Sequence, residues 1–335
     1  MNEYTLLAGD IGATNTKLAF YTAEEGLFKP LFEKTLKNDD FESFDDLLDV
    51  YLESTDTSFQ AICFGIAGVN ILNRIQVTNL GWDIDGTELQ KKFSLKGAWL
   101  LNDLQALSYA VVNLRDEDLS IIRTGKKVDC APIAVIAPGT GLGEGFLTWD
   151  GEMYQAQSTE GGHVDFGPTN DRQVHLLNYL QKKLPRVSYE NVCSGIGIPN
   201  LYDFLRDQDY AKEPEWLREK INQVSDSAPV IFNTALDEEK DCELCRLTVE
   251  LFAEILGAEA GNLALKTLAQ GGIYIGGGIP PRILPWLKQD TVIKAITEKD
   301  PHTELMSSIP VMVITNPIAN LIGAAYFGFM KLSLL

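Results

Sequence analysis

Asn102 and Asp103 have the residue types and the position that acid–base chemistry requires. They follow the apolar run 98–101 and precede a helical pattern. Both side chains are therefore expected at the carboxyl end of a strand, where α/β proteins place their ligands. Asp103 could accept a proton there. The alternative is that both residues cap the helix, because Asn and Asp are favoured N-caps, and capping and catalysis are compatible.

Glu160 and His163 form a second polar pair, separated by two glycines. Glycines at this spacing let the backbone and the side chains approach a small polar ligand closely. A single histidine is more often a satisfied core residue, but the carboxylate beside it favours a binding role. Glu190 is a further acid, although it also has a structural explanation as a first-turn residue of a helix. The sequence alone does not single it out.

Two glycine-rich turns predict phosphate binding. The first, GDIGATN at 9–15, lies between the apolar run 6–8 and an alternating run at 17–20. The second, PGTGLG at 138–143, has the same layout, so the chain looks internally duplicated. A period of two residues indicates strands rather than helices around the turns. The strict spacings of the P-loop and of the dinucleotide fingerprint are both missing, which disfavours those folds.

Two such hairpins can face each other across a cleft and hold a polyphosphate with their backbone N–H groups. Asp10 would add a carboxylate beside a bound magnesium ion, through water. Either turn alone could be an ordinary hairpin, but the pair favours phosphate binding. A third glycine run, 276–278, ends an apolar strand just before two prolines. It predicts room for an adenine ring next to a helix start, with a simple tight turn as the alternative.

The composition limits the classes of partner. The formal net charge of -19 and the pI near 4.5 argue against binding to nucleic acid or to an anionic membrane. Five cysteines without a shared spacing favour reduced thiols. The first ten residues lack the features of a signal peptide, and the longest apolar stretch, 321–330, is too short to span a bilayer. We therefore expect a cytoplasmic protein with no nucleic-acid or membrane partner.

The length of 335 residues predicts two α/β domains. We expect a small domain formed by 1–113 plus 316–335 and a large domain formed by 114–315. The segment 114–129 is charged and has no clear period, so it is expected to be a crossing between the domains. Periodicity predicts strands at 61–66 and 98–101, and helices at 42–53, 104–112, 173–184, 201–206, 214–222, 228–237, 243–268 and 316–330.

Six motifs in this order resemble the bacterial glucokinase family, a hexokinase-like group of the actin and ribonuclease H-like ATPase superfamily. The resemblance covers essentially the whole chain. The motifs are GDIGATN at 9–15, LLND at 100–103, APGTGLG at 137–143, EGGHVDF at 160–166, YENVCSG at 189–195 and GGGIPPR at 276–282.

The resemblance implies a two-lobed α/β fold with a mixed sheet in each lobe and a cleft between the lobes. It implies transfer of the terminal phosphoryl group of ATP, with magnesium, to the 6-hydroxyl of glucose, and assembly as a homodimer. Asp103 would be the general base. The glucose ligands would be Asn102, Asp103, Glu160, His163 and Glu190. The nucleotide contacts would be Gly9, Asp10, Ile11, Gly12, Ala13, Thr14, Asn15, Gly139, Thr140, Gly141, Gly276, Gly277 and Gly278.

Ala13 departs from the pattern, because the family usually has a second glycine at this position. If the turn needs a positive φ here, alanine is penalised. Two rival functions share the expected scaffold. One is a nucleotide-switched binding or filament protein, and the other is a polyphosphate or acyl-phosphate enzyme. Neither has a reason to assemble the polar cluster at 102, 103, 160, 163 and 190.

Overall fold

The computed structural model describes residues 4–77, 80–237 and 239–334. The chain forms two compact units. Unit 1 consists of Met1–Asp118, Asp150–Ser158 and Asn316–Leu335, and unit 2 of Leu119–Trp149 and Thr159–Thr315. The predicted domains, 1–113 plus 316–335 and 114–315, stay a prediction.

The sheet of unit 1 has the strand order β3-β2-β1-β4-β8. The first three strands form an antiparallel meander, and β4 and β8 run parallel to β1. Continuous apolar runs form the buried central strands, and all six residues of β4 are buried, as expected for a sheet covered on both faces. The strands are β1 Thr5–Ile11, β2 Asn15–Thr22, β3 Leu31–Lys37, β4 Ala61–Ile66 and β8 Gly97–Asn102.

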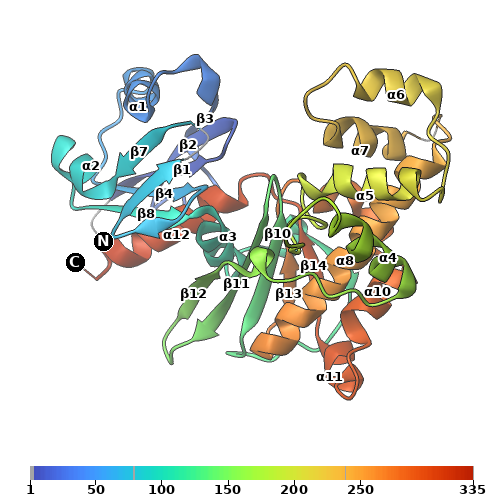
Figure 1. The fold of residues 1–335 in the computed structure, drawn as a ribbon. Coiled ribbons are helices and arrows are strands. Elements are labelled where there is room, and N and C mark those ends of the chain that lie inside the picture. The colour runs from blue at the N-terminus through green and yellow to red at the C-terminus, as the bar shows by residue number, and fades with distance from the viewer. Residues whose placement is uncertain (1–3, 78–79, 238, 335) are drawn as a thin grey trace. The chain divides into compact units, whose positions relative to one another are not determined.

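Helices cover this sheet, and a small antiparallel sheet adds to unit 1. The C-terminal helix α12, red in Figure 1, packs against α3 and against strands β1 and β4 from the other end of the chain. Its close approach depends on Gly323, where a Cβ would lie 1.7 Å from the carbonyl oxygen of Ala106. The helices are α1 Phe44–Glu53, α2 Gly86–Lys92, α3 Asp103–Val111 and α12 Ala319–Leu332, and the small sheet contains β5 Asn70–Ile71, β6 Arg74–Val77 and β7 Trp82–Asp85.

The second sheet has the order β12-β11-β10-β13-β14-β9, and the strands from β11 to β9 lie in unit 2. Strands β10 and β11 form an antiparallel hairpin, and β13 and β14 run parallel to β10. This repeats the layout of unit 1 and confirms the predicted internal duplication. The strands are β9 Leu119–Arg123, β10 Ile133–Pro138, β11 Leu142–Trp149, β12 Tyr154–Thr159, β13 Ile273–Ile275 and β14 Val311–Ile314.

The core of unit 2 is built around α8, the long helix drawn in orange in Figure 1. It packs against α5, α7 and α10 and against β10. The helices of unit 2 are α4 Asp171–Leu180, α5 Gly197–Asp207, α6 Glu215–Ile221, α7 Ala228–Leu236, α8 Glu243–Thr267, α9 Leu284–Leu287, α10 Asp290–Thr297 and α11 Thr303–Ser308. Short 3-10 helices occur at Asn38–Asp40, Asp116–Asp118, Gly161–His163 and Pro280–Ile283.

The prediction for 114–129 is wrong in part, because this segment contains strand β9. The strand pairs antiparallel with β14 at the sheet edge, and Ile122 is its single buried residue. An edge strand with one buried side chain lacks the alternation of apolar and polar residues from which a strand is predicted. Helix α5 also begins earlier than predicted, at Gly197. Within the described residues, no helix combines the length and the apolar character that crossing a bilayer needs.

Candidate active site

The glycine turn of 9–15 and Asp103 lie at the same edge of the unit 1 sheet. This turn and the one at 138–143 are called the first and second phosphate turns, after their predicted role. The parallel register aligns Ile11 with Ile66, and Ile66 with Asn102. The turn at 12–14 follows Ile11, and Asp103 follows Asn102, so both leave the carboxyl ends of neighbouring parallel strands. Ligands of open α/β sheets bind at this edge. The structure therefore brings together two sets of residues that are about ninety positions apart in the sequence.

Gly65 of β4 allows helix α3 to pack closely on this strand. A Cβ at Gly65 would lie 2.7 Å from the Cβ of Ala106, and it would be 3.9 Å from the Cα of Asp103. The first turn of α3 therefore packs directly on β4. Asp103 is half-buried, and its Oδ1 accepts a hydrogen bond from the amide of Leu104 at 2.8 Å.

Asn102 is the N-cap of α3. Its Oδ1 accepts hydrogen bonds from the amides of Leu104 and Gln105, at 2.9 and 3.4 Å. The Gln105 side chain in turn accepts from the Asn102 amide at 3.3 Å, which completes a capping box. The Asn102 side-chain amide donates to the carbonyl of Gly68 at 3.0 Å. The capping interpretation of Asn102 is therefore confirmed, and it fixes where α3 begins.

Asn38 holds the first phosphate turn in shape. Its side-chain amide donates to the Gly12 carbonyl at 2.9 Å, its backbone amide donates to the Thr14 carbonyl at 3.0 Å, and its Oδ1 accepts from the buried Thr16 hydroxyl at 2.8 Å. Nothing in the local sequence marks Asn38, because the contact depends on how the meander folds back. Ala13 is not among the described residues with a positive φ, so the penalty considered for alanine does not apply.

Asp10 lies near the end of β1, immediately before that turn. Its Oδ1 accepts a hydrogen bond from the side-chain amide of Asn320 in α12 at 3.0 Å. Burial raises the pKa of the Asp10 carboxyl, while the bond from Asn320 and the charge of Lys17 act in the opposite direction. Asn320 is a second residue that sequence reasoning missed, because it is 310 positions away.

The second phosphate turn is braced by two distant segments of unit 2. Gly195 and Ile196 donate backbone hydrogen bonds to the carbonyls of Gly139 and Thr140, at 2.8 and 3.2 Å. Gly277, with φ of +86°, lies so close that its Cβ would be 2.4 Å from the Pro138 carbonyl oxygen. The glycine run 276–278 therefore packs against the start of this turn. Such proximity is necessary if both segments belong to one nucleotide site, as predicted.

Glu160, His163 and Glu190 come together in unit 2. His163 lies between the two carboxylates, with Nε2 3.8 Å from Oε2 of Glu160 and Nδ1 3.8 Å from Oε1 of Glu190. The Glu190 amide donates to the Gly162 carbonyl at 2.8 Å. Glu190 does not belong to a helix, so its interpretation as a first-turn acid is wrong. The structure singles out Glu190 where the sequence did not.

The site residues thus form two groups, one in each unit. Unit 1 carries the first phosphate turn, Asn102 and Asp103, and unit 2 carries the second turn, the glycine run 276–278 and the acid and histidine cluster. The unit 1 group, and the second turn and the glycine run of unit 2, follow the carboxyl ends of parallel strands. That the two groups act on one substrate pair is part of the proposal below.

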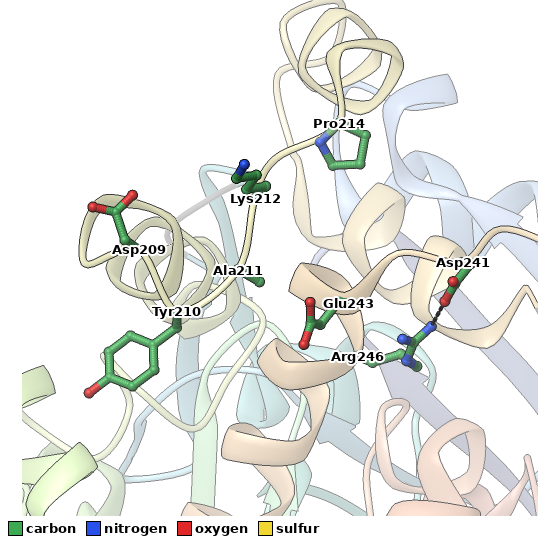
Figure 2. Close-up of a pocket in the computed structure, with 8 residues that line it drawn as sticks. All are labelled: Asp209, Tyr210, Ala211, Lys212, Pro214, Asp241, Glu243 and Arg246. Carbon is green, nitrogen blue, oxygen red and sulfur yellow. Dashed lines mark hydrogen bonds and ion pairs between the residues drawn. The ribbon is translucent and has the colours of Figure 1, made fainter.

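Two cavities lie apart from these groups. One has a volume of about 540 Å³ and lies at the start of α8. There Arg246 pairs with Asp241 at 2.6 Å, an ion pair that Figure 2 marks with a dashed line. Another, of about 420 Å³, is mainly apolar and lies beside α12. The predicted site residues line neither cavity. The first is lined by Asp209, Tyr210, Ala211, Lys212, Pro214, Asp241, Glu243 and Arg246.

Comparison with known proteins decides the family, since the family model described as glucokinase matches residues 7–330. The chain belongs to the glucokinase family. A glucokinase of Nostoc punctiforme is 39% identical over 333 residues, which cover 96% of this chain and 97% of the relative.

One solved structure supports the family assignment, and a second supports the fold. A glucokinase from an Antarctic psychrotroph is 31% identical and has a TM-score of 0.84, with 97% of this chain and 99% of that chain covered. A ROK-family glucokinase from Streptomyces griseus, solved with glucose and AMPPNP, is 15% identical and has a TM-score of 0.59, with coverages of 97% and 99%. At 15% identity, the similarity to the Streptomyces griseus structure shows a shared fold only.

The predicted glucokinase family and the predicted actin-like α/β fold with a mixed sheet in each lobe are both confirmed. Glucokinases transfer a phosphoryl group from ATP to glucose, and membership assigns this chain to that reaction class. It thereby selects the kinase hypothesis over the nucleotide switch and the polyphosphate enzyme. The roles of individual residues rest on the geometry described above.

Proposed function

We propose that Asp103 is the general base in the ATP-dependent phosphorylation of the 6-hydroxyl of D-glucose. The observation that carries the proposal is the register of β1, β4 and β8, because it puts Asp103 and the first phosphate turn at one sheet edge. Asp103 begins α3, and the positive end of a helix stabilises a carboxylate there. An ionised carboxylate at the acceptor end of the transfer is what this chemistry requires.

The reaction needs no covalent enzyme intermediate. The carboxylate of Asp103 takes the proton of the 6-hydroxyl while that oxygen bonds to the γ-phosphorus of ATP. The bond from the γ-phosphorus to the bridging oxygen of ADP breaks at the same time, giving glucose 6-phosphate and ADP. Positioning and electrostatic stabilisation provide most of the catalysis in such transfers.

The two glycine turns would hold the phosphates of ATP. The first turn is Gly9–Asn15, and the second contains Gly139, Thr140 and Gly141. Backbone N–H groups in such turns bind anions without a basic side chain, which suits a chain of formal net charge -19. Gly276, Gly277 and Gly278 would contact the adenosine. Support comes from the packing of Gly277 against Pro138, which places this run beside the second turn.

A magnesium ion fits this arrangement through Asp10. Within the described residues, no three His, Cys, Asp or Glu side chains group so as to hold a metal ion by themselves. Magnesium usually takes one or two carboxylates and completes its shell with water and substrate phosphates. Asp10 offers one carboxylate next to the first turn, oriented by Asn320. When bound, the ion would neutralise charge on the phosphates.

Glucose would be bound by Asn102, Asp103, Glu160, His163 and Glu190. Ionised groups form hydrogen bonds to hydroxyls worth about 1.5–3 kcal/mol each. A sugar in which one of these hydroxyls is missing or inverted would lose a hydrogen bond to a half-buried carboxylate such as Glu190, and this discriminates between epimers. The Glu190 side chain is 22% exposed and lies within reach of His163, so an unpaired charge there is costly.

The test replaces Asp103 with Asn, which keeps the size of the side chain but cannot accept the proton. We expect kcat for glucose-dependent ATP turnover to fall by about 100-fold or more, while glucose binding measured by calorimetry weakens by about tenfold, roughly the value of one charged hydrogen bond. Asp116→Asn is the matched control, because Asp116 is exposed in the same unit. Normal turnover by a folded Asp103→Asn variant would refute the proposal.

Assembly as a homodimer and a cytoplasmic location complete the proposal. Both rest on the membership of this chain in the glucokinase family. Sedimentation of the purified protein at several concentrations tests the first, and fractionation of the source cells tests the second.

A further inference from the structure

Glu144 is a buried acid that the proposed reaction does not use. It is the third residue of β11, two positions beyond Leu142, and only 1% of its surface is exposed. Its Oε1 has no hydrogen-bond partner among the residues that the structure describes. Buried polar atoms are nearly always paired, so an unpaired carboxyl oxygen calls for an explanation.

The side chain of Glu144 supports the segment that carries Glu160 and His163. A Cβ at Gly161 would lie 2.3 Å from Oε2 of Glu144, so the carboxyl group fills the space directly under this glycine. A Cβ at Gly162 would lie 2.1 Å from the carbonyl oxygen of Leu142. The two glycines therefore rest on β11 at its first and third residues, and any larger residue would lift the segment.

Hydrogen bonds tie the same segment to Glu144. The Thr159 hydroxyl donates to the backbone carbonyl of Glu144 at 2.8 Å, and the Gly161 amide donates to the Thr159 hydroxyl at 3.0 Å. On its other side, the segment holds Glu190, whose amide donates to the carbonyl of Gly162. The position of the proposed sugar ligands thus depends on how Glu144 fills its pocket.

The charges around Glu144 favour its neutral form. Glu259 of α8 is fully buried, and its carboxylate pairs with Lys266 at 3.2 Å and accepts from the Asn262 amide at 2.8 Å. Burial, and then the charge of Glu259, raise the pKa of Glu144 to about 8, against the opposing effect of Lys266.

Among the described residues, the other titratable groups of this region interact with Glu259. Burial raises the pKa of the Cys193 thiol, and the negative charge of Glu259 raises it further. Tyr189 bonds to Asn262 at 3.1 Å, and burial followed by Glu259 raises the pKa of its phenol. Lys299 donates to the side-chain oxygen of Asn262 at 2.8 Å. These groups surround Glu259 and leave Glu144 to be neutralised by its own proton.

We propose that Glu144 is a positioning residue for glucose binding, whose neutral carboxyl group holds Gly161 and Gly162 against β11 and so fixes Glu160 and His163. This inference rests on the proposed function of those two residues. When Glu144 ionises, a second negative charge appears under Gly161 beside Glu259, and the segment moves away from it. The affinity for glucose then falls, while Asp103, which lies in the other unit, still acts as the general base.

The decisive variant is Glu144→Gln, which keeps the shape of the neutral acid but does not ionise. The wild-type KM for glucose should rise about tenfold between pH 7 and pH 9, since one proton is lost near pH 8. The KM of the Gln variant should stay flat over this range and match the wild-type value at pH 7. The kcat should change much less than KM in both proteins. Glu152→Gln, an exposed acid, should keep the wild-type profile.

A second measurement does not depend on glucose. Hydrogen exchange of the amides at 159–164, compared between wild type and Glu144→Gln at the same pH, should agree at pH 7. At pH 9 the wild type should exchange at least about threefold faster, in line with a local opening. Equal exchange at pH 9, or a Gln variant that keeps the alkaline rise in KM, would overturn the positioning role. A wild type that binds no glucose but shows the exchange difference would overturn only the proposed function.

Discussion

The backbone amide of Leu142 donates a hydrogen bond to Oε2 of Glu190 at 3.0 Å, across 48 positions of sequence. Leu142 follows Gly141 of the second phosphate turn, and a Cβ at Gly141 would lie 2.4 Å from the same carboxylate oxygen. One carboxylate therefore contacts both the turn proposed to bind ATP and, at 3.8 Å, His163 of the segment proposed to bind glucose. If the proposed roles hold, Glu190 links the donor and acceptor positions of unit 2.

Two variants of Glu190 should separate these contacts. Glu190→Gln keeps an oxygen that can accept from Leu142, so it should raise KM for glucose by about tenfold, roughly the value of one charged hydrogen bond, and leave KM for ATP within about twofold. Glu190→Ala loses both contacts and should raise both KM values. Steady-state kinetics with each substrate varied in turn is the measurement. Equal ATP KM values in both variants would argue against the coupling.

Ala13→Gly should not improve the enzyme, although the family usually has glycine at this position. The turn is held by Asn38, and Ala13 does not have a positive φ. Glycine would therefore relieve no strain, and it would lower stability by about 0.4–1 kcal/mol by adding freedom to the unfolded chain. Denaturant unfolding and ATP titration check this. A clear gain in ATP affinity would show that the bound turn needs a conformation alanine resists.

Glu144 should make the stability of the protein fall as pH rises from about 5 to about 8. Below the ordinary pKa of 4.5 both folded and unfolded states hold the proton. Between that value and the folded pKa of about 8, the unfolded state has lost the proton and the folded state retains it. The contribution of Glu144 should then fall by about 1.4 kcal/mol per pH unit. Above the folded pKa, the contribution of Glu144 to stability no longer changes with pH.

Glu144→Gln removes this dependence. The stability of the variant relative to wild type should therefore increase steadily from pH 5 to pH 8, as measured by denaturant unfolding at each pH. A constant difference across that range would mean that Glu144 is already ionised in the folded protein.

Gly323→Ala should destabilise the protein by about 3 kcal/mol, at the upper end of overpacking effects. The new Cβ would meet the backbone carbonyl of Ala106 at 1.7 Å, and a backbone atom cannot rotate away. Helix α12 would have to move off α3. Gly278→Ala is the matched control for stability, because its Cβ would meet nothing within 4 Å. Thermal unfolding of both variants is the measurement, and similar transition temperatures would contradict the packing argument.

Local patterns were sufficient where neighbouring residues decide the structure. The strand at 61–66 is found as predicted, and the helix predicted at 104–112 is α3 at 103–111, because an apolar run and an N-cap are visible in a short window. The same holds for the two glycine turns and for the order of motifs that resembles the glucokinase family. Strand β9 was missed because an edge strand buries too little to leave a pattern.

The sequence by itself determined which reactive groups are present: an acid after a strand, two glycine turns, and an acid and histidine pair with glycines between them. Only the tertiary structure decided which residues support that chemistry. Asn38 on the first turn, Asn320 on Asp10, Glu190 on Leu142 and Glu144 under Gly161 are all contacts between distant segments. The physical reason is that strand register and helix docking set these distances, and neither is encoded in a short stretch of chain.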